Sequence, residues 1–408
     1  MQKASFMDEP LKKRRELYKN IKRRYFYKTR KTREFLEFAK KISSEELRDN
    51  IHAFTKSPSI KEAIFTLKDL IGSSTWVSVA YMKHIITVVK FLQSSESLPL
   101  PKQDFIVNQV ANKNVISPQY ASNAEIFEAI YNDLTRENDE LEYKSRLKLA
   151  PHKITIVLVS GVFNELFKTA AFEKGCEQIC KELKAKYFVA KVGGAKGVKH
   201  NAALLKDQLE NYIKKHPTEK LWIVAFSKGG VDSLHYLRHN EEFANKHING
   251  ISTIASPIIG SSRADQKILL AIRSLQNLAK NYLFTRDKLE RDLFAIKLQE
   301  SVSSKVQGKW FKNNYKELPK KLFYTALGLR ASWHESHLGM IATKIILPTK
   351  EANDGIVDIC QSQFPDYFKA YNLGIIKGHH LIGYRLSSYS QDILIKAHII
   401  FLQYMGRL

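Results

Sequence analysis

The chain has 408 residues and a formal net charge of +24, from 65 lysines and arginines against 41 aspartates and glutamates. Its hydrophobic content of 44% excludes a chain that is disordered throughout, and three cysteines are too few for a disulfide framework, so a reducing compartment fits best. The large positive charge indicates an anionic partner, which is either a membrane surface or a nucleic acid.

Residues 1–150 are expected to form a basic helical N-terminal region. It opens with a basic arm, from Lys12 to Arg33, in which Glu16 is the only acidic residue. Apolar residues recur in the arm at helical spacing, which predicts a narrow apolar stripe in a basic field. Three interpretations stay open: the arm binds anionic lipid, it follows nucleic-acid phosphates, or it packs on the protein and its charges are solvated. Between the two ligands lipid is favoured, and nucleic acid is not the expected partner.

We expect neither a signal peptide nor a transmembrane helix from the sequence. The first residues, MQKASFMDEPLKKRR, have no apolar core behind their charges. The most apolar helical stretch, residues 76–92, carries a polar stripe of Lys83, Thr87 and Lys90 and is short for a bilayer. We therefore expect a cytoplasmic protein, with peripheral attachment to a membrane as a further hypothesis.

The pattern changes at Pro151, where a mostly parallel sheet is expected to begin. Short apolar runs predict strands at residues 153–160, 186–192, 221–226, 248–255, 322–326 and 373–377. Helical patterns separate several of these runs, which predicts βαβ units and an α/β domain over residues 151–408. A helical insertion at about 261–320 interrupts the sheet, with amphipathic helices expected at 266–284 and 286–304.

Ser227 directly follows the predicted strand at 221–226 and directly precedes a helical pattern. Small residues, Ala225 and Gly229, stand two positions before and two after it, as a tight strand-to-helix turn requires. A serine on such a turn lies at the carboxyl edge of a parallel sheet and becomes a nucleophile once a base takes its proton. An ordinary turn with a serine N-cap is the alternative.

Four segments together resemble α/β-hydrolases, and bacterial triacylglycerol lipases in particular. In chain order they are AFSKGG at 225–230, TIASPIIGSSRAD at 253–265, NDGIVD at 353–358 and GHHLIGY at 378–384. The resemblance implies the α/β-hydrolase fold, with a nucleophilic serine, an acid and a histidine following in that order. The insertion then resembles a lipase lid, which would cover an acyl-chain pocket and open at a lipid surface.

The resemblance assigns each catalytic role to a residue of this chain. It implies Ser227 as nucleophile and Asp354 as the acid, with Asp358 as the fallback. It implies His380 as the base in preference to His379, because an aliphatic residue follows His380 as it does in the lipases. The alternative for Asp354 is that Asn-Asp-Gly forms only a turn.

Lys228 would begin the helix after Ser227, so its backbone N–H is expected to face a developing oxyanion, and the resemblance implies the Val162 N–H as the second donor of this oxyanion hole. Ser160 stands where the lipases have a histidine, which departs from the family pattern. No cofactor is expected. No metal is expected either, because the histidines of the segment HESH at 334–337 are three residues apart, and helical zinc sites need a spacing of four.

The sequence therefore predicts a serine ester hydrolase, similar to lipases and phospholipases, that cleaves a carboxylic ester of a lipid through an acyl-enzyme. One alternative is hydrolysis of another ester, a polyester or an amide by the same residues. A second alternative, from a different class, is a non-catalytic membrane- or nucleic-acid-binding protein on a hydrolase scaffold.

Overall fold

The structure is a computed structural model in which residues 97–408 form one compact unit. It describes residues 100–139, 143–161, 170–194, 196–265, 300–332, 336, 340, 344, 351–383 and 389–408. The basic arm from Lys12 to Arg33 and the apolar stretch at 76–92 lie outside the described residues, so the expectations for them stay predictions.

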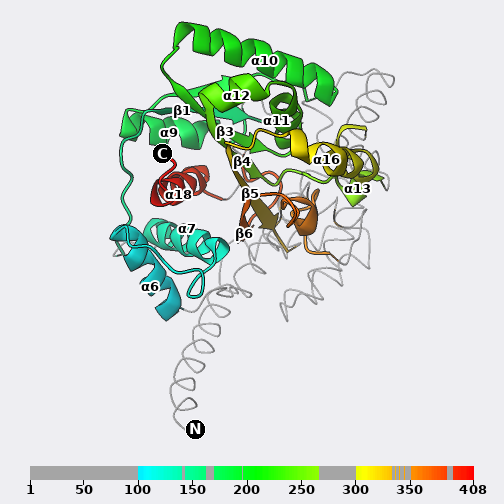
Figure 1. The fold of residues 1–408 in the computed structure, drawn as a ribbon. Helices are drawn as coiled ribbons and strands as arrows, with labels where there is room; N and C mark the ends of the chain where they lie inside the picture. Colours follow the sequence, from blue (N-terminus) through cyan, green and yellow to red (C-terminus); the bar gives the residue numbers. More distant parts are fainter. Residues whose placement is uncertain are drawn as a thin grey trace, which may run out of the picture. The chain divides into compact units, whose positions relative to one another are not determined.

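A six-stranded sheet forms the centre of this unit (Figure 1). Its spatial order is β2-β1-β3-β4-β5-β6, and every neighbouring pair is parallel. The strands are β1 (Ile154–Val159), β2 (Tyr187–Ala190), β3 (Lys220–Phe226), β4 (Ile248–Ile254), β5 (Phe323–Arg330) and β6 (Tyr371–Lys377). They correspond to the six apolar runs, so the predicted α/β class is confirmed. The strand order reverses between β1 and β3, and open parallel sheets bind ligands at the carboxyl ends beside such a point.

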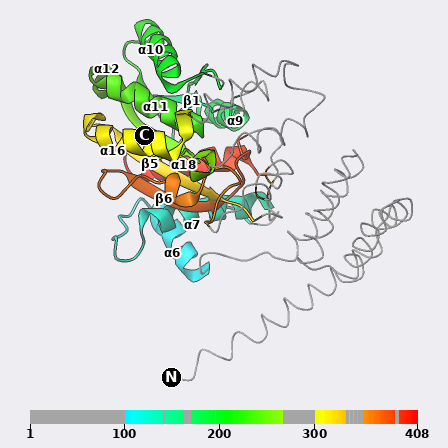
Figure 2. The ribbon, with the colours of Figure 1, turned by 90° about the vertical axis from the view of Figure 1, so that its right-hand side faces the viewer.

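Helices cover both faces of the sheet (Figures 1 and 2). They are α9 (Glu173–Leu183), α10 (Val198–Lys215), α11 (Lys228–His239), α12 (Glu241–His247) and α18 (Gln391–Tyr404). Side chains of α9 and α18 share a core with one face of the sheet, and side chains of α10, α11 and α12 share a core with the other. Neighbours along β3 alternate between the two cores, which is why its sequence has to be apolar throughout.

The compact unit begins before Pro151, the boundary expected from the sequence. Helices α6 (Leu100–Ala111) and α7 (Asn123–Asp139) precede β1, and α7 packs on β6 and α18. Phe127 of α7 is fully buried, with its ring 5.9 Å from that of Phe401 in α18. The start of the sheet at 151 is therefore not the start of the unit, because two earlier helices complete its core.

The insertion between β4 and β5 is described at its two ends. These ends are α13 (Ser262–Asp265) and, after the gap, η1 (Ser304–Gly308), α16 (Lys309–Asn314) and η2 (Tyr315–Glu317). The two ends meet, because the Ser303 and Ser304 hydroxyls donate to the Asp265 carboxylate. Most of the two expected amphipathic helices lies outside the described residues. Within the part that is described, no helix combines the length and apolar character needed to cross a membrane.

His398 of α18 gives the fold a dependence on pH. Burial lowers the pKa of this imidazole to about 4, and its Nε2 has no hydrogen-bond partner among the described residues. Between pH 4 and pH 6.5 the unfolded chain binds a proton that the folded chain does not, so stability falls as pH falls through this window.

We expect His398→Leu to remove this loss, which amounts to about 3 kcal/mol between pH 7 and pH 4. Urea unfolding of both proteins at pH 7 and pH 4.5 measures it. An equal pH dependence of the two proteins would contradict the assignment to His398.

Candidate active site

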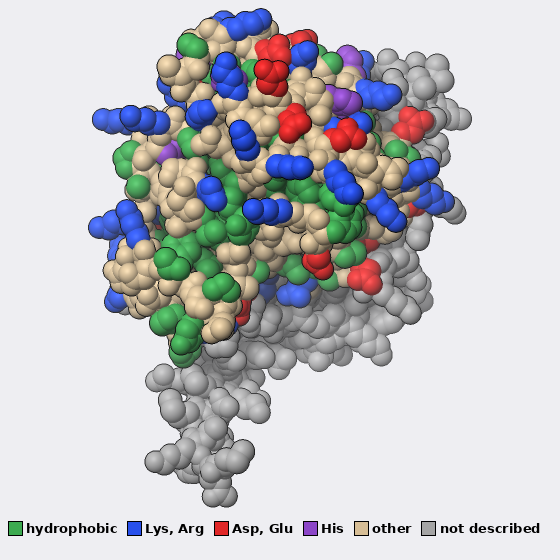
Figure 3. Space-filling view, viewed as in Figure 1, with side chains coloured by type: hydrophobic (Ala, Val, Ile, Leu, Met, Phe, Trp, Pro, Cys, Tyr) green, Lys and Arg blue, Asp and Glu red, His purple; other side chains and the backbone are tan. Residues whose placement is uncertain are grey.

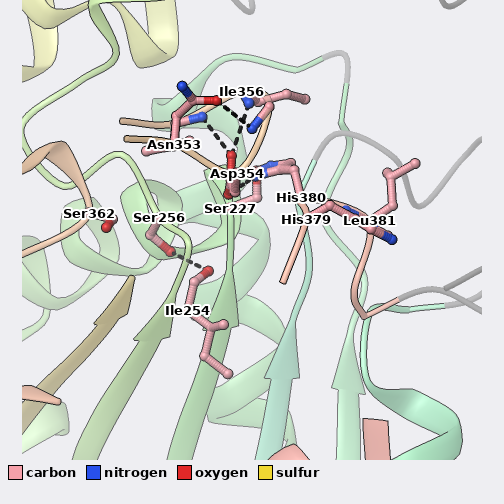
Figure 4. A network of polar contacts seen from close by, with 12 residues as sticks. Ser227, Ile254, Ser256, Asn353, Asp354, Ile356, Ser362, His379, His380 and Leu381 are labelled. Atoms are coloured by element: carbon pink, nitrogen blue, oxygen red, sulfur yellow. Dashed lines mark hydrogen bonds and ion pairs between the residues drawn. The ribbon is translucent and has the colours of Figure 1, made fainter. Parts of the chain in front are cut away.

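Ser227 occupies a sharp turn between β3 and α11 (Figure 4). Its backbone has φ 54° and ψ −131°, a conformation that L-residues seldom adopt and that costs energy. Glycines let the helix start at once: a Cβ on Gly229 would lie 2.4 Å from the Val159 carbonyl oxygen, and one on Gly230 would lie 2.2 Å from Ser256 Oγ. The predicted strand–serine–helix turn is therefore present, and its close contacts explain the small residues.

Asp354 lies in a loop that directs its carboxylate by hydrogen bonds. Oδ1 accepts the backbone N–H groups of Ile356, at 2.9 Å, and Val357, at 2.8 Å. Gly355, with φ 110°, permits this turn, and Asn353 Oδ1 accepts its N–H at 2.9 Å. These bonds occupy one carboxylate oxygen and leave the other directed toward His380.

His380 follows β6 and connects the other two residues. Its Nδ1 lies 2.6 Å from Asp354 Oδ2, and its Nε2 lies 2.7 Å from Ser227 Oγ. The structure thus brings Ser227, His380 and Asp354 together in one hydrogen-bonded row (Figure 4). All three are buried, with exposed fractions of 6%, 0% and 1%.

The electrostatics of the row select one tautomer of His380. Burial opposes the charge of Asp354, but His380 and the Ile356 and Val357 N–H groups outweigh it, so the pKa of this carboxyl is lowered. An ionised carboxylate can only accept, so His380 Nδ1 carries the hydrogen. Nε2 is left to accept the proton of the Ser227 hydroxyl, which is the arrangement that activates a serine.

The two alternative residues from the sequence lie elsewhere. His379 Nδ1 accepts the Leu381 N–H at 3.1 Å, and its ring contacts Tyr389 with 5.3 Å between centroids. Asp358 Oδ2 accepts the Ser262 hydroxyl at 2.7 Å. Neither takes the place of His380 or Asp354 in the row.

The residue that follows β1 lies close to the Ser227 hydroxyl and to the backbone nitrogen of Lys228. Gly161 follows this strand, and a Cβ on it would lie 3.0 Å from the Lys228 nitrogen and 3.1 Å from Ser227 Oγ. Val162 lies outside the described residues, as do His334, Glu335 and His337. Ser160, which stands where the lipases have histidine, accepts the Ala171 N–H at 2.7 Å and so ties together the two ends of the segment at 162–169.

Gly161→Ala is expected to lower kcat toward a soluble ester by about 10²- to 10³-fold, the range that loss of one oxyanion donor gives. The methyl group would lie close to Ser227 Oγ and the Lys228 N–H, where a carbonyl oxygen would lie if Ser227 is the nucleophile. Steady-state kinetics with a p-nitrophenyl ester measures the loss, and thermal unfolding checks that the variant is folded. A folded variant with wild-type kcat would show that this space is not used.

The Lys228 side chain forms an ion pair that was not predicted from the sequence, where only its backbone N–H was assigned a role. The ammonium is buried and lies 2.8 Å from Asp232 Oδ1. The i, i+4 spacing of a lysine and an aspartate on one helix was the available signal. This spacing does not indicate burial, because such pairs normally lie on the solvent-exposed face of a helix.

No protein-family model and no curated protein matches the sequence. Among solved structures, a metagenomic carboxyl esterase superposes with a TM-score of 0.52 at 17% identity, over 78% of this chain and 98% of that one. A Bacillus licheniformis lipase in its mature form gives 0.42 at 19% identity, over 64% and 93%. EstA from Clostridium botulinum gives 0.45 at 13% identity, over 69% and 99%. At these identities the likeness to the esterase shows the fold, and it confirms the predicted α/β-hydrolase architecture.

Proposed function

We propose that this chain, which has the α/β-hydrolase fold, is a serine ester hydrolase that cleaves a carboxylic ester of a lipid through an acyl-enzyme. The observation that carries the proposal is the hydrogen-bonded row, with Ser227 Oγ 2.7 Å from His380 Nε2 and His380 Nδ1 2.6 Å from Asp354 Oδ2. A nucleophile, a base and an orienting carboxylate in this geometry are what acyl transfer requires.

In the proposed reaction, Ser227 Oγ attacks the ester carbonyl while His380 Nε2 takes the hydroxyl proton. Asp354 stabilises the imidazolium that forms and keeps Nδ1 protonated. The Lys228 N–H, with that of Val162 as the second donor, receives the negative oxygen of the tetrahedral intermediate. His380 then protonates the leaving alcohol, and a water molecule, activated by the same imidazole, releases the acid from Ser227.

A lipid is the proposed substrate class because the described start of the insertion lies beside the loop that carries Asp354. It begins after β4 at the carboxyl edge of the sheet, where Ser227 also lies, and Ser262 at its start donates to Asp358 in the loop of Asp354. A lid there would cover an acyl chain, and micelles or vesicles should then raise the activity toward a soluble ester.

An anionic membrane surface is the proposed partner of the arm from Lys12 to Arg33. Lysine and arginine side chains are scattered over the described face in Figure 3, with no dense cluster of them there. The arm therefore has a denser run of lysines and arginines in its sequence than the described face has on its surface, and it is the better candidate to bind an anionic membrane. Release of the protein from acidic vesicles by salt would test this partner.

A substrate panel tests the proposed function and its nearest alternatives. It compares short and long p-nitrophenyl esters, a triglyceride, a phospholipid, a polyester and an amide, using wild type and Ser227→Ala. We expect hydrolysis of esters, and labelling by a fluorophosphonate probe, that the variant lacks. No labelling of wild type, or equal labelling of the two proteins, would favour the non-catalytic alternative on a hydrolase scaffold.

A further inference from the structure

The helix that follows Ser227 begins with a buried cation. Lys228 is 1% exposed, and its Nζ lies 2.8 Å and 2.9 Å from the two carboxylate oxygens of Asp232, one helical turn later. Asp232 is also 1% exposed. Charged side chains are almost never buried in this way unless they are paired, so the two residues depend on each other.

A third residue links this ion pair to another part of the carboxyl edge. Asn201, in the first turn of α10, donates from Nδ2 to Asp232 Oδ2 at 2.8 Å. The same amide group binds Gly193 twice, donating to its carbonyl at 2.9 Å and accepting its N–H at 3.0 Å. The network therefore connects the first turn of α11, the first turn of α10 and the loop after β2.

Stability alone gives little reason for an ion pair at this place. Burial raises the pKa of Asp232 to about 6 against the opposing effects of Lys228 and Asn201, which shows the cost of holding the charge there. Buried ion pairs are often no more stabilising than uncharged side chains of similar volume. The position of the pair suggests a different role, because it spans the turn of α11 that starts directly after the strained Ser227.

The backbone of that turn has to stay in one place for the proposed reaction. The Lys228 N–H is among the four N–H groups that the first turn of a helix leaves without an intrahelical partner, so it is available to an oxyanion. Unwinding of this turn would relax Ser227 from its positive φ and would also move the N–H. The salt bridge between Lys228 and Asp232 joins the two ends of this first turn, and it therefore opposes unwinding of the turn.

We propose that Lys228 and Asp232, anchored by Asn201, are positioning residues that hold the Lys228 N–H and the Ser227 hydroxyl in their reactive geometry. This inference rests on the proposed function and deepens it. The side chains do not touch the reacting atoms and act through the backbone of the turn. Their loss should therefore affect the transition state more than the binding of the ester.

The test removes both charges together, so that neither is left buried and unpaired. Lys228→Met/Asp232→Asn keeps the side-chain volumes, and the new amide oxygen still accepts from Asn201. Arg238→Met/Glu317→Gln is the matched control, because it removes an ion pair with an Nε–Oε2 distance of 2.9 Å from the last turn of the same helix. Thermal unfolding, kcat and KM for p-nitrophenyl butyrate, and the affinity of a boronic acid that forms a tetrahedral adduct with serine are measured for each.

We expect the double variant to fold and to lose about 10- to 100-fold in kcat, the scale of a displaced rather than a deleted donor, with KM nearly unchanged. Boronic acid affinity should fall with kcat, and the control should match wild type. Asn201→Ala, which keeps the pair and removes its anchor, should lose less.

Wild type and Ser227→Ala are assayed beside these variants. Inactive wild type, or active Ser227→Ala, would overturn the proposed function and this inference with it. A second outcome would overturn the positioning role alone. In it wild type is active and Ser227→Ala is inactive, while the double variant and Asn201→Ala fold and keep a kcat within about twofold of wild type. If the double variant does not fold, the kcat of Asn201→Ala alone tests the positioning role: a value within about twofold of wild type would overturn it, and a larger loss would support it.

Discussion

Ser227→Ala is expected to lower kcat toward a soluble ester by about 10⁶-fold, and His380→Ala by a similar factor. In the proposed mechanism the two residues work as one unit, because the hydroxyl is nucleophilic only while His380 Nε2, 2.7 Å away, takes its proton. The double variant should therefore be no slower than either single variant. The residual rate would come from binding and from oxyanion donors that both substitutions leave in place.

Single-turnover and steady-state hydrolysis of p-nitrophenyl butyrate measure these rates. Ser256→Ala is the matched control, since Ser256 is also a buried serine at the carboxyl edge and its hydroxyl contacts the Ile254 carbonyl oxygen rather than His380 (Figure 4). It should keep activity near that of wild type. A Ser227→Ala protein that retains a tenth of the wild-type rate, or losses that multiply in the double variant, would contradict the assignment.

The sequence carried enough information to predict the sheet, and it singled out the three side chains that the structure brings into one hydrogen-bonded row. The six strands could be predicted because a strand buried on both faces needs a continuous apolar run, as in residues 154–159. Ser227 could be located because a tight turn between strand and helix requires small neighbours. Glycine at position 229 follows directly from its contact with the Val159 carbonyl oxygen.

Features that depend on long-range packing could not be predicted in the same way. The helices of residues 100–139 belong to the unit because Phe127 and its neighbours pack on α18, more than 250 residues away, and no local pattern reports that contact. The preference for His380 over His379 came only from the resemblance, through the aliphatic residue that follows His380, and the structure brings His380 to Ser227. Local composition cannot distinguish two adjacent histidines that are both buried.

The hydrogen bonds of Asp354 explain why its replacement by asparagine should be severe while the fold stays intact. The backbone N–H groups of Ile356 and Val357 can only donate, so they require the oxygen of the new amide at the present position of Oδ1. The amide NH₂ then faces His380 Nδ1 and can only donate to it. The imidazole has to place its hydrogen on Nε2, where it can no longer accept the Ser227 proton.

Asp354→Asn is therefore expected to lower kcat by about 10⁴-fold, the loss that accompanies the wrong histidine tautomer in a site of this kind, with little change in KM. Thermal unfolding would show whether the variant keeps its fold, and ester hydrolysis would give the rate. Asp358→Asn is the matched control from the same loop, because Asp358 accepts the Ser262 hydroxyl. A larger loss for Asp358→Asn than for Asp354→Asn would transfer the role of the acid to Asp358, since only the carboxylate that orients His380 should control the tautomer.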